Sequence, residues 1–175
     1  MMEFLAQLRM RCGNWLVRLL RRLLRVEGRS EDPRELTPGE VVARILYTKS
    51  HFSRERKRPK PGAFNPSPYT ELSGIHVTGL ADPVIWEIAR NTMRDHPGRN
   101  TIYARADVPV KQFLEQKLRA VLDDKPFKRH ASVVGWPIIA DQDQRKERWK
   151  EICLALSESP QVQLVLPQTP VVLRE

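Results

Sequence analysis

Four side chains of this sequence have the types that metal-free phosphodiester cleavage requires: His51, Arg105, Arg129 and His130. In such a reaction one imidazole accepts a hydroxyl proton, the other protonates the leaving oxygen, and a cation stabilises the charged phosphorus intermediate. His51 and His130 form the natural pair, with Arg129 or Arg105 as the cation. Asp107 either orients one imidazole or caps the helix expected to follow it. These residues predict a metal-independent, ribonuclease-like site.

A second candidate site is the segment SHFSRERKRPKPGAF, residues 50–64, which concentrates positive charge. Phe52 can stack on a base, and five cations can each neutralise a phosphate: Arg54, Arg56, Lys57, Arg58 and Lys60. Pro59 and Pro61 exclude a regular helix, because proline lacks an amide donor and restricts the residue before it. We expect an extended loop that binds nucleic acid by charge and shape rather than by sequence. The alternative is a solvated loop without a ligand.

The net charge of +9 is unevenly distributed along the 175 residues. Residues 1–62 hold 15 Lys and Arg against 7 Asp and Glu, a net charge of +8. Residues 63–175 hold 15 against 14, a net charge of +1. The N-terminal third is therefore expected to meet an acidic partner, either nucleic acid or an anionic membrane.

Residues 3–26 are typical of a basic amphipathic helix. Apolar side chains recur at three- and four-residue steps, and arginines share the opposite side. Such stripes usually pack against protein, so we expect docking on the body of the molecule, on a protein partner or in an oligomer. An anionic membrane surface and nucleic acid are the alternative ligands of this helix. A polar linker is expected over residues 27–36.

No cofactor or metal is expected. The two cysteines, Cys12 and Cys153, lie in different expected helices and belong to no CxxC or Cys/His cluster, which argues against zinc and against a disulfide framework. The sequence also lacks GxxxxGK[ST], GxGxxG, GxSxG and HExxH motifs. A reducing cytoplasm is the expected location, since the sequence has neither a run of 18 apolar residues nor a signal for export.

Periodicity predicts a single α/β or α+β domain over residues 37–175. Thr37 and Glu40 have capping-box spacing, so a helix is expected from Thr37 to Thr48. Further along, strands are expected at 74–80, 101–106, 129–136 and 162–166, and helices at 82–94, 109–118 and 141–157. This alternation predicts a small mixed sheet of about four strands covered by helices.

Several segments resemble a family of small, uncharacterised bacterial proteins. The segments are KPGAF at 60–64, GIHVTGL at 74–80, RAD at 105–107 and RHASVVGWP at 129–137. The resemblance covers roughly residues 44–166 and leaves out the N-terminal helix. It implies a bacterial protein and favours nucleic-acid or defence biology, but it implies no mechanism.

The leading hypothesis is a non-enzymatic accessory or binding protein. It would engage nucleic acid through residues 54–60, without sequence specificity, and dock on a protein through residues 3–26. The alternatives are the ribonuclease-like enzyme and a protein-only adaptor in a larger assembly.

Overall fold

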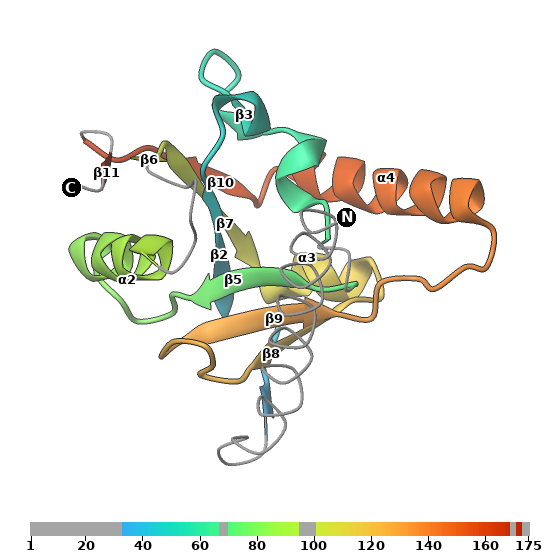
Figure 1. Ribbon diagram of the computed structural model, residues 1–175, viewed down its shortest axis with the longest axis horizontal. Coiled ribbons are helices and arrows are strands. Elements are labelled where there is room, and N and C mark those ends of the chain that lie inside the picture. Colours follow the sequence, from blue (N-terminus) through green and yellow to red (C-terminus); the bar gives the residue numbers. More distant parts are fainter. Residues whose placement is uncertain (1–32, 67–69, 95–100, 169–170, 173–175) are drawn as a thin grey trace, which may run out of the picture. The chain divides into compact units, whose positions relative to one another are not determined.

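The computed structural model describes residues 33–66, 70–94, 101–168 and 171–172 (Figure 1). These residues belong to one compact unit that runs from Pro33 to Glu175. The helix predicted over residues 3–26 and most of the linker predicted at 27–36 lie outside the described residues.

The unit is built on a seven-stranded sheet in which every neighbouring pair of strands is antiparallel. In spatial order the strands are β1 (Arg34–Glu35), β8 (Arg119–Leu122), β9 (His130–Val134), β5 (Leu72–His76), β2 (Val41–Leu46), β7 (Ala104–Pro109) and β10 (Gln163–Val165). The expectation of about four strands in a mixed sheet is therefore wrong, and the fold is α+β. The additional strands are either very short or lie where a helix or no regular element was expected.

The helix predicted from Thr37 to Thr48 is replaced by a turn and the strand β2. The Glu40 carboxylate does accept hydrogen bonds from the Thr37 backbone N–H at 2.6 Å and from its hydroxyl at 3.0 Å. However, the Glu40 N–H donates to the Thr37 carbonyl at 3.0 Å, which closes a turn. The following VVARIL is rich in β-branched residues, and it runs through the middle of the sheet, where both of its faces are covered. The capping-box contacts form, but tertiary burial determines the conformation of the residues that follow.

The two faces of the sheet are covered by different helices. On one face, called here the α2 face, helix α2 (Asp82–Arg94) packs Ile85, Ala89 and Met93 with strand residues that include Ile45 and Ile75. On the other, the α4 face, the larger core lies under α3 (Val110–Glu115), α4 (Gln142–Glu158) and the 3-10 turn η2 (Pro61–Phe64). Helices α2, α3 and α4 confirm the helices expected from residue 82 onward, within a few residues at their ends.

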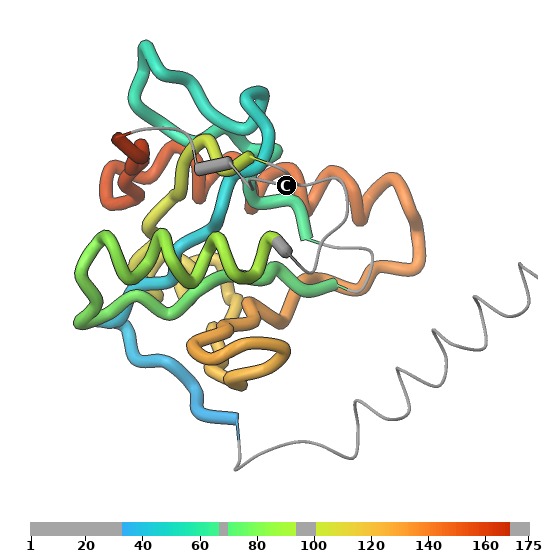
Figure 2. Tube along the Cα trace, turned by 60° about the vertical axis from the view of Figure 1, so that its left-hand side comes forward, coloured from blue at the N-terminus to red at the C-terminus, as the bar shows by residue number. Residues whose placement is uncertain are grey.

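Two small two-stranded ladders complete the described part. β3 (Phe52–Ser53) and β4 (Arg58–Pro59) form a hairpin that follows the 3-10 turn η1 (Lys49–His51). β6 (Thr101–Ile102) pairs with β11 (Val171–Val172). In Figures 1 and 2 the hairpin stands away from the sheet, at the upper end of β2. Among the described residues no helix has both the length and the apolar character needed to cross a bilayer.

Candidate functional sites

The segment with the concentrated positive charge forms the β3–β4 hairpin rather than an irregular loop. Its turn is closed by the Arg56 N–H, which donates to the Ser53 hydroxyl at 3.2 Å, and by the Lys57 N–H, which donates to the Arg54 carbonyl at 3.3 Å. Lys57 has a φ of 49°, in the left-handed region that such tight turns use. At the base, the Lys60 N–H donates to the His51 carbonyl at 2.8 Å. Hydrogen bonds thus hold the hairpin at both ends.

Phe52 anchors the hairpin instead of presenting a ring to a ligand. The residue is only 4% exposed and belongs to the core of the α4 face. Pro59, its partner in the ladder, is also buried. The expectation that Phe52 stacks on a base is therefore corrected, because neither face of its ring is available. An aromatic residue beside a charge cluster can bind a ligand or pack in a core, and its neighbours in the sequence do not distinguish these roles.

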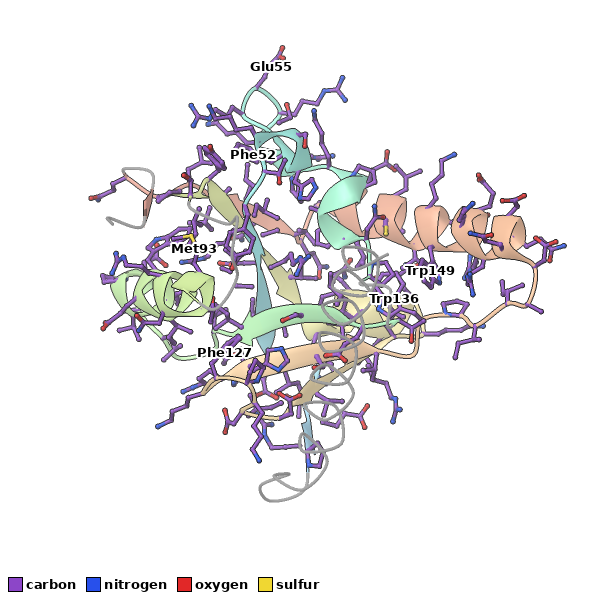
Figure 3. All side chains as sticks on the ribbon, in the orientation of Figure 1. Phe52, Glu55, Met93, Phe127, Trp136 and Trp149 are labelled. Carbon is purple, nitrogen blue, oxygen red and sulfur yellow. The ribbon has the colours of Figure 1, made fainter. Side chains whose placement is uncertain are left out.

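All five predicted phosphate-binding cations are exposed: Arg54, Arg56, Lys57, Arg58 and Lys60. Within the described part of the chain none of them lies within ion-pair distance of a carboxylate. Glu55 is the one acidic residue between positions 54 and 60. Figure 3 shows it at the tip of the hairpin, pointing away from the unit. The hairpin is therefore an outward-facing cationic surface.

The four residues predicted for phosphodiester cleavage do not come together. Arg129 directly precedes β9, which begins at His130, and its side chain contacts His76. Since Ile75 pairs with His130 and His76 is the next residue of β5, Arg129 and His130 lie on opposite faces of the sheet. Arg129 donates from Nη1 to Nδ1 of His76 at 3.1 Å and to the Thr78 carbonyl at 3.3 Å. Its guanidinium is thereby held on the α4 face, away from the His130 imidazole.

Arg105 is buried on the α2 face and is engaged by two carboxylates. Its Nε and Nη2 donate to Asp107 at 2.9 to 3.1 Å, and its Nη2 donates to Asp82 at 2.7 Å. The guanidinium carbon also lies 5.0 Å from the centroid of the Trp86 ring. Burial raises the pKa of the Asp107 carboxyl, and Arg105 opposes that rise. Asp107 thus pairs with an arginine and does not orient an imidazole.

His51 lies on the side of the sheet opposite to His130. Its ring sits beside Gly62 in η2, near Arg44, whose Nε donates to the Ala63 carbonyl at 3.1 Å. Burial lowers the pKa of the His51 imidazole, and the nearby positive charge of Arg44 lowers it further. The sheet separates this imidazole from that of His130, so the two do not share a reacting group.

His130 instead belongs to a row of three polar residues on the α2 face. Its Nδ1 lies 2.5 Å from Oδ1 of Asp123, and its Nε2 lies 2.8 Å from the Ser73 hydroxyl oxygen. Ser73 and His130 come from the neighbouring strands β5 and β9. Ile75 pairs directly with His130, and Ser73 is the next residue on the same face. A serine, a histidine and an aspartate are therefore joined in a continuous line of hydrogen bonds.

A second serine and a second carboxylate extend this line. The Ser132 hydroxyl hydrogen-bonds to Glu71 and lies 3.2 Å from Oδ2 of Asp123. Phe127 covers the imidazole of His130 edge-on, with ring centroids 4.9 Å apart. Figure 3 shows Phe127 beside β9, far from Phe52 and the cationic hairpin. The polar row and the hairpin are thus two separate sites.

Glu40, His76 and Cys153 also have shifted pKa values, each with a structural cause. Arg34 lowers the pKa of the Glu40 carboxyl to about 2 by donating two hydrogen bonds at 2.7 and 3.0 Å. Nε2 of His76 lies 3.0 Å from Glu40, outside hydrogen-bond geometry, and burial lowers the pKa of this imidazole. Burial raises the pKa of the Cys153 thiol to about 12, which leaves no nucleophilic thiolate at neutral pH. No group of three or more potential metal ligands occurs among the described residues.

His130 was predicted as a site residue, whereas its partners Ser73 and Asp123 were not. The sequence holds a weak signal: Ser73 lies two residues before the apolar Ile75, and Ser132 lies two residues after His130. These period-two positions place hydroxyls and an imidazole on one face of two strands. Which strands pair, and in which register, cannot be read from a single sequence.

No protein-family model, no curated protein and no solved structure matches this chain. The two sites are therefore interpreted from their own geometry and chemistry.

Proposed function

We propose that this protein binds nucleic acid through the β3–β4 hairpin, by contacts to the phosphate backbone. One observation carries the proposal. Five exposed cations stand on a hairpin that is anchored in the core, and no carboxylate among the described residues neutralises them. Against the single acid Glu55, five cations leave a net charge of +4 over residues 54–60. Such a surface attracts a polyanion, and binding releases the counterions of that polyanion.

The hairpin geometry favours backbone contacts over base recognition. A ribbon of two residues per strand is much smaller than the ribbons and helices that fill a DNA groove. The only aromatic residue of the hairpin is Phe52, and its ring is buried. Without stacking and without groove contacts, the expected affinity depends strongly on salt and weakly on sequence.

The test is the salt dependence of binding to a mixed-sequence DNA duplex, measured with the full chain. Replacing Arg56, Lys57 and Arg58 together by glutamine leaves up to three phosphates without a cation. The negative slope of log K against log salt should then become less steep by about 0.9 for each such phosphate, or by roughly 2 to 3 in all. Fluorescence anisotropy at four or five salt concentrations measures this slope.

A charge-matched control separates a local surface from the overall charge. Replacing Lys146, Arg148 and Lys150 on α4 by glutamine removes the same three charges, from side chains that lie 2.6 to 3.6 Å from neighbouring carboxylates. This variant should keep the wild-type slope. Equal slopes for wild type and hairpin variant, or an equal decrease of the slope in both variants, would reject the hairpin as the binding surface.

A further inference from the structure

We propose that Ser73 is an activated nucleophile, with His130 as its general base and Asp123 as the group that orients His130. The reaction class would be acyl transfer from small uncharged carboxylic esters to the Ser73 hydroxyl. This activity is independent of nucleic-acid binding, because the polar row and the cationic hairpin are separate.

The hydrogen bonds assign the role of each group. A contact of 2.5 Å between Nδ1 of His130 and the Asp123 carboxylate is satisfied when the Nδ1–H donates to the carboxylate oxygen. In that tautomer Nε2 carries the lone pair, and at 2.8 Å it accepts the hydrogen of the Ser73 hydroxyl. Both distances fall within the range of a nucleophile, a base and an orienting group in contact. A triad is recognised by this geometry and not by a sequence motif.

The sheet holds Ser73 and His130, and a backbone hydrogen bond holds Asp123 beside them. Ser73 and His130 lie in β5 and β9, which pair over four residues each, and Asp123 directly follows β8. The Asp123 N–H donates to the His130 carbonyl at 3.2 Å, which fixes the carboxylate next to the imidazole. Ser132 helps to position Asp123 from its other side. Paired strands and one backbone hydrogen bond therefore set the distances within the row.

Accessibility distinguishes the two serines of the row. Ser73 is exposed, whereas Ser132 is 5% exposed and hydrogen-bonds to Glu71. The His130 side chain is only 6% exposed and lies under Phe127, so its imidazole is reached from the side of Ser73. A reagent that approaches the α2 face can thus reach the Ser73 oxygen and no other hydroxyl of the row.

The proposed acyl transfer needs only Ser73, His130, the ester and water. The Ser73 oxygen forms a bond to the acyl carbon, and the proton of its hydroxyl passes to Nε2 of His130. The bond between the acyl carbon and the alcohol oxygen breaks, and His130 returns the proton to the leaving alcohol. Water then takes the place of the alcohol: its oxygen bonds to the acyl carbon and its proton passes to Nε2 of His130. The bond between the acyl carbon and the Ser73 oxygen breaks, His130 returns the proton to Ser73, and the carboxylic acid leaves. Asp123 and Glu71 add negative charge near Ser73, which disfavours anionic acyl groups and favours uncharged ones.

The test is covalent capture of Ser73 by diisopropyl fluorophosphate, followed by mass spectrometry of the intact chain and of its peptides. The serine oxygen displaces fluoride from phosphorus, so one phosphoryl adduct should form on the peptide that carries Ser73. The Ser73→Ala variant should form none. His130→Gln should lower the labelling rate by at least about 100-fold, because it removes the general base.

Controls keep this result interpretable. Ser50 is exposed and has no side-chain hydrogen-bond partner among the described residues, so Ser50→Ala should be labelled like wild type. If His130→Gln fails to fold, Asp123→Asn tests the same row at a partly exposed position, and its labelling should slow by about tenfold or more. A burst of nitrophenol from p-nitrophenyl acetate should accompany labelling in wild type and vanish in Ser73→Ala. Absence of a Ser73 adduct in wild type, or equal labelling of wild type and His130→Gln, would overturn the proposal.

Discussion

Glu40 shows how one carboxylate can couple the stability of this unit to pH. It accepts hydrogen bonds from Arg34 and Thr37, and Arg34 lowers its pKa from 4.5 to about 2. A carboxyl whose folded-state pKa lies below its unfolded-state value stabilises the fold above the unfolded value. That contribution is lost as the pH falls from about 4.5 towards 2.

We therefore predict that Glu40→Gln lowers the free energy of unfolding at pH 7 by about 1 to 2 kcal/mol, since Arg34 is half-exposed and its ion pair is partly screened. The difference between variant and wild type should shrink as the pH is lowered from 5 to 3. Urea unfolding at several pH values measures it. Glu115→Gln, at a loose 4.0 Å pair with Lys111, is the matched control and should stay close to wild type throughout. A pH-independent difference would contradict the assigned pKa.

At the scale of elements, Arg105 joins helix α2 to strand β7. It donates hydrogen bonds to Asp107 in its own strand and to Asp82 in the first turn of α2. The Trp86 ring lies next to its guanidinium. Its Nη1 has no hydrogen-bond partner among the described residues. The charge is thus kept in the interior by two carboxylates and one ring.

Replacing Arg105 should lower the free energy of unfolding far more than replacing its exposed partner Asp82. Arg105→Gln leaves the Asp107 carboxylate buried without a cation, and we expect a decrease of about 3 to 5 kcal/mol in the free energy of unfolding. Asp82→Asn removes a carboxylate that is 60% exposed and should cost less than about 1 kcal/mol. Equilibrium urea unfolding compares the two, and similar decreases would show that Arg105 does not hold the interior charge balance.

The elements differ in how far the sequence could predict them. Helix α2 has clear 3.6-residue periodicity, and in α4 the buried residues Ile152, Cys153 and Leu156 follow helical spacing. Both helices have N-terminal aspartates, and Asp141 caps α4 by accepting from the N–H groups of Asp143 and Gln144 at 3.0 and 2.8 Å. A helix was predicted where β2 lies, because Thr37 and Glu40 make capping-box contacts around a turn. Local hydrogen bonds were thus predictable, whereas burial of VVARIL between two layers was not.

In the candidate sites, too, local features were predictable from the sequence, whereas contacts that depend on strand pairing were not. Five of the six predicted nucleic-acid-binding residues are exposed as expected, because a dense charge run cannot be buried without partners. The prediction of the cleavage residues depends on residue type and on position near strand ends, and neither determines the face of the sheet. Arg129 precedes β9 and contacts His76, whereas His130 lies on the face of its strand partner Ile75, so the two side chains are on opposite faces of the sheet. Ser73 and Asp123 escaped prediction because strand register alone brings them to His130.

At the scale of the whole molecule, the unit that begins at Pro33 has core clusters of its own. Both described clusters are built from residues at or after Leu36. Deleting residues 1–32 should therefore leave the thermal unfolding midpoint within a few degrees of the full chain. Differential scanning calorimetry measures the midpoint. A drop of ten degrees or more would show that the N-terminal segment contributes to the core.

The same deletion tests which of the proposed partners binds residues 3–26: a protein, a second copy of this chain or an anionic membrane. Docking through residues 3–26 predicts that the shortened chain no longer binds a protein partner or forms its own oligomer, as seen by analytical ultracentrifugation. Flotation with anionic liposomes tests the membrane alternative. Binding of duplex DNA by the hairpin should survive the deletion, with its salt slope reduced only by the phosphates that the removed arginines neutralised.

The margins of the seven-stranded sheet have a consequence for behaviour in a crowded solution. β1 at one margin has two residues and β10 at the other has three, so each leaves only a brief row of unpaired peptide groups. Both residues of β1, Arg34 and Glu35, are also charged. A strand from a neighbouring molecule would find too few amides and carbonyls there to extend the sheet. The short edge strands thus disfavour the addition of strands from other molecules, and with it self-association into fibrils.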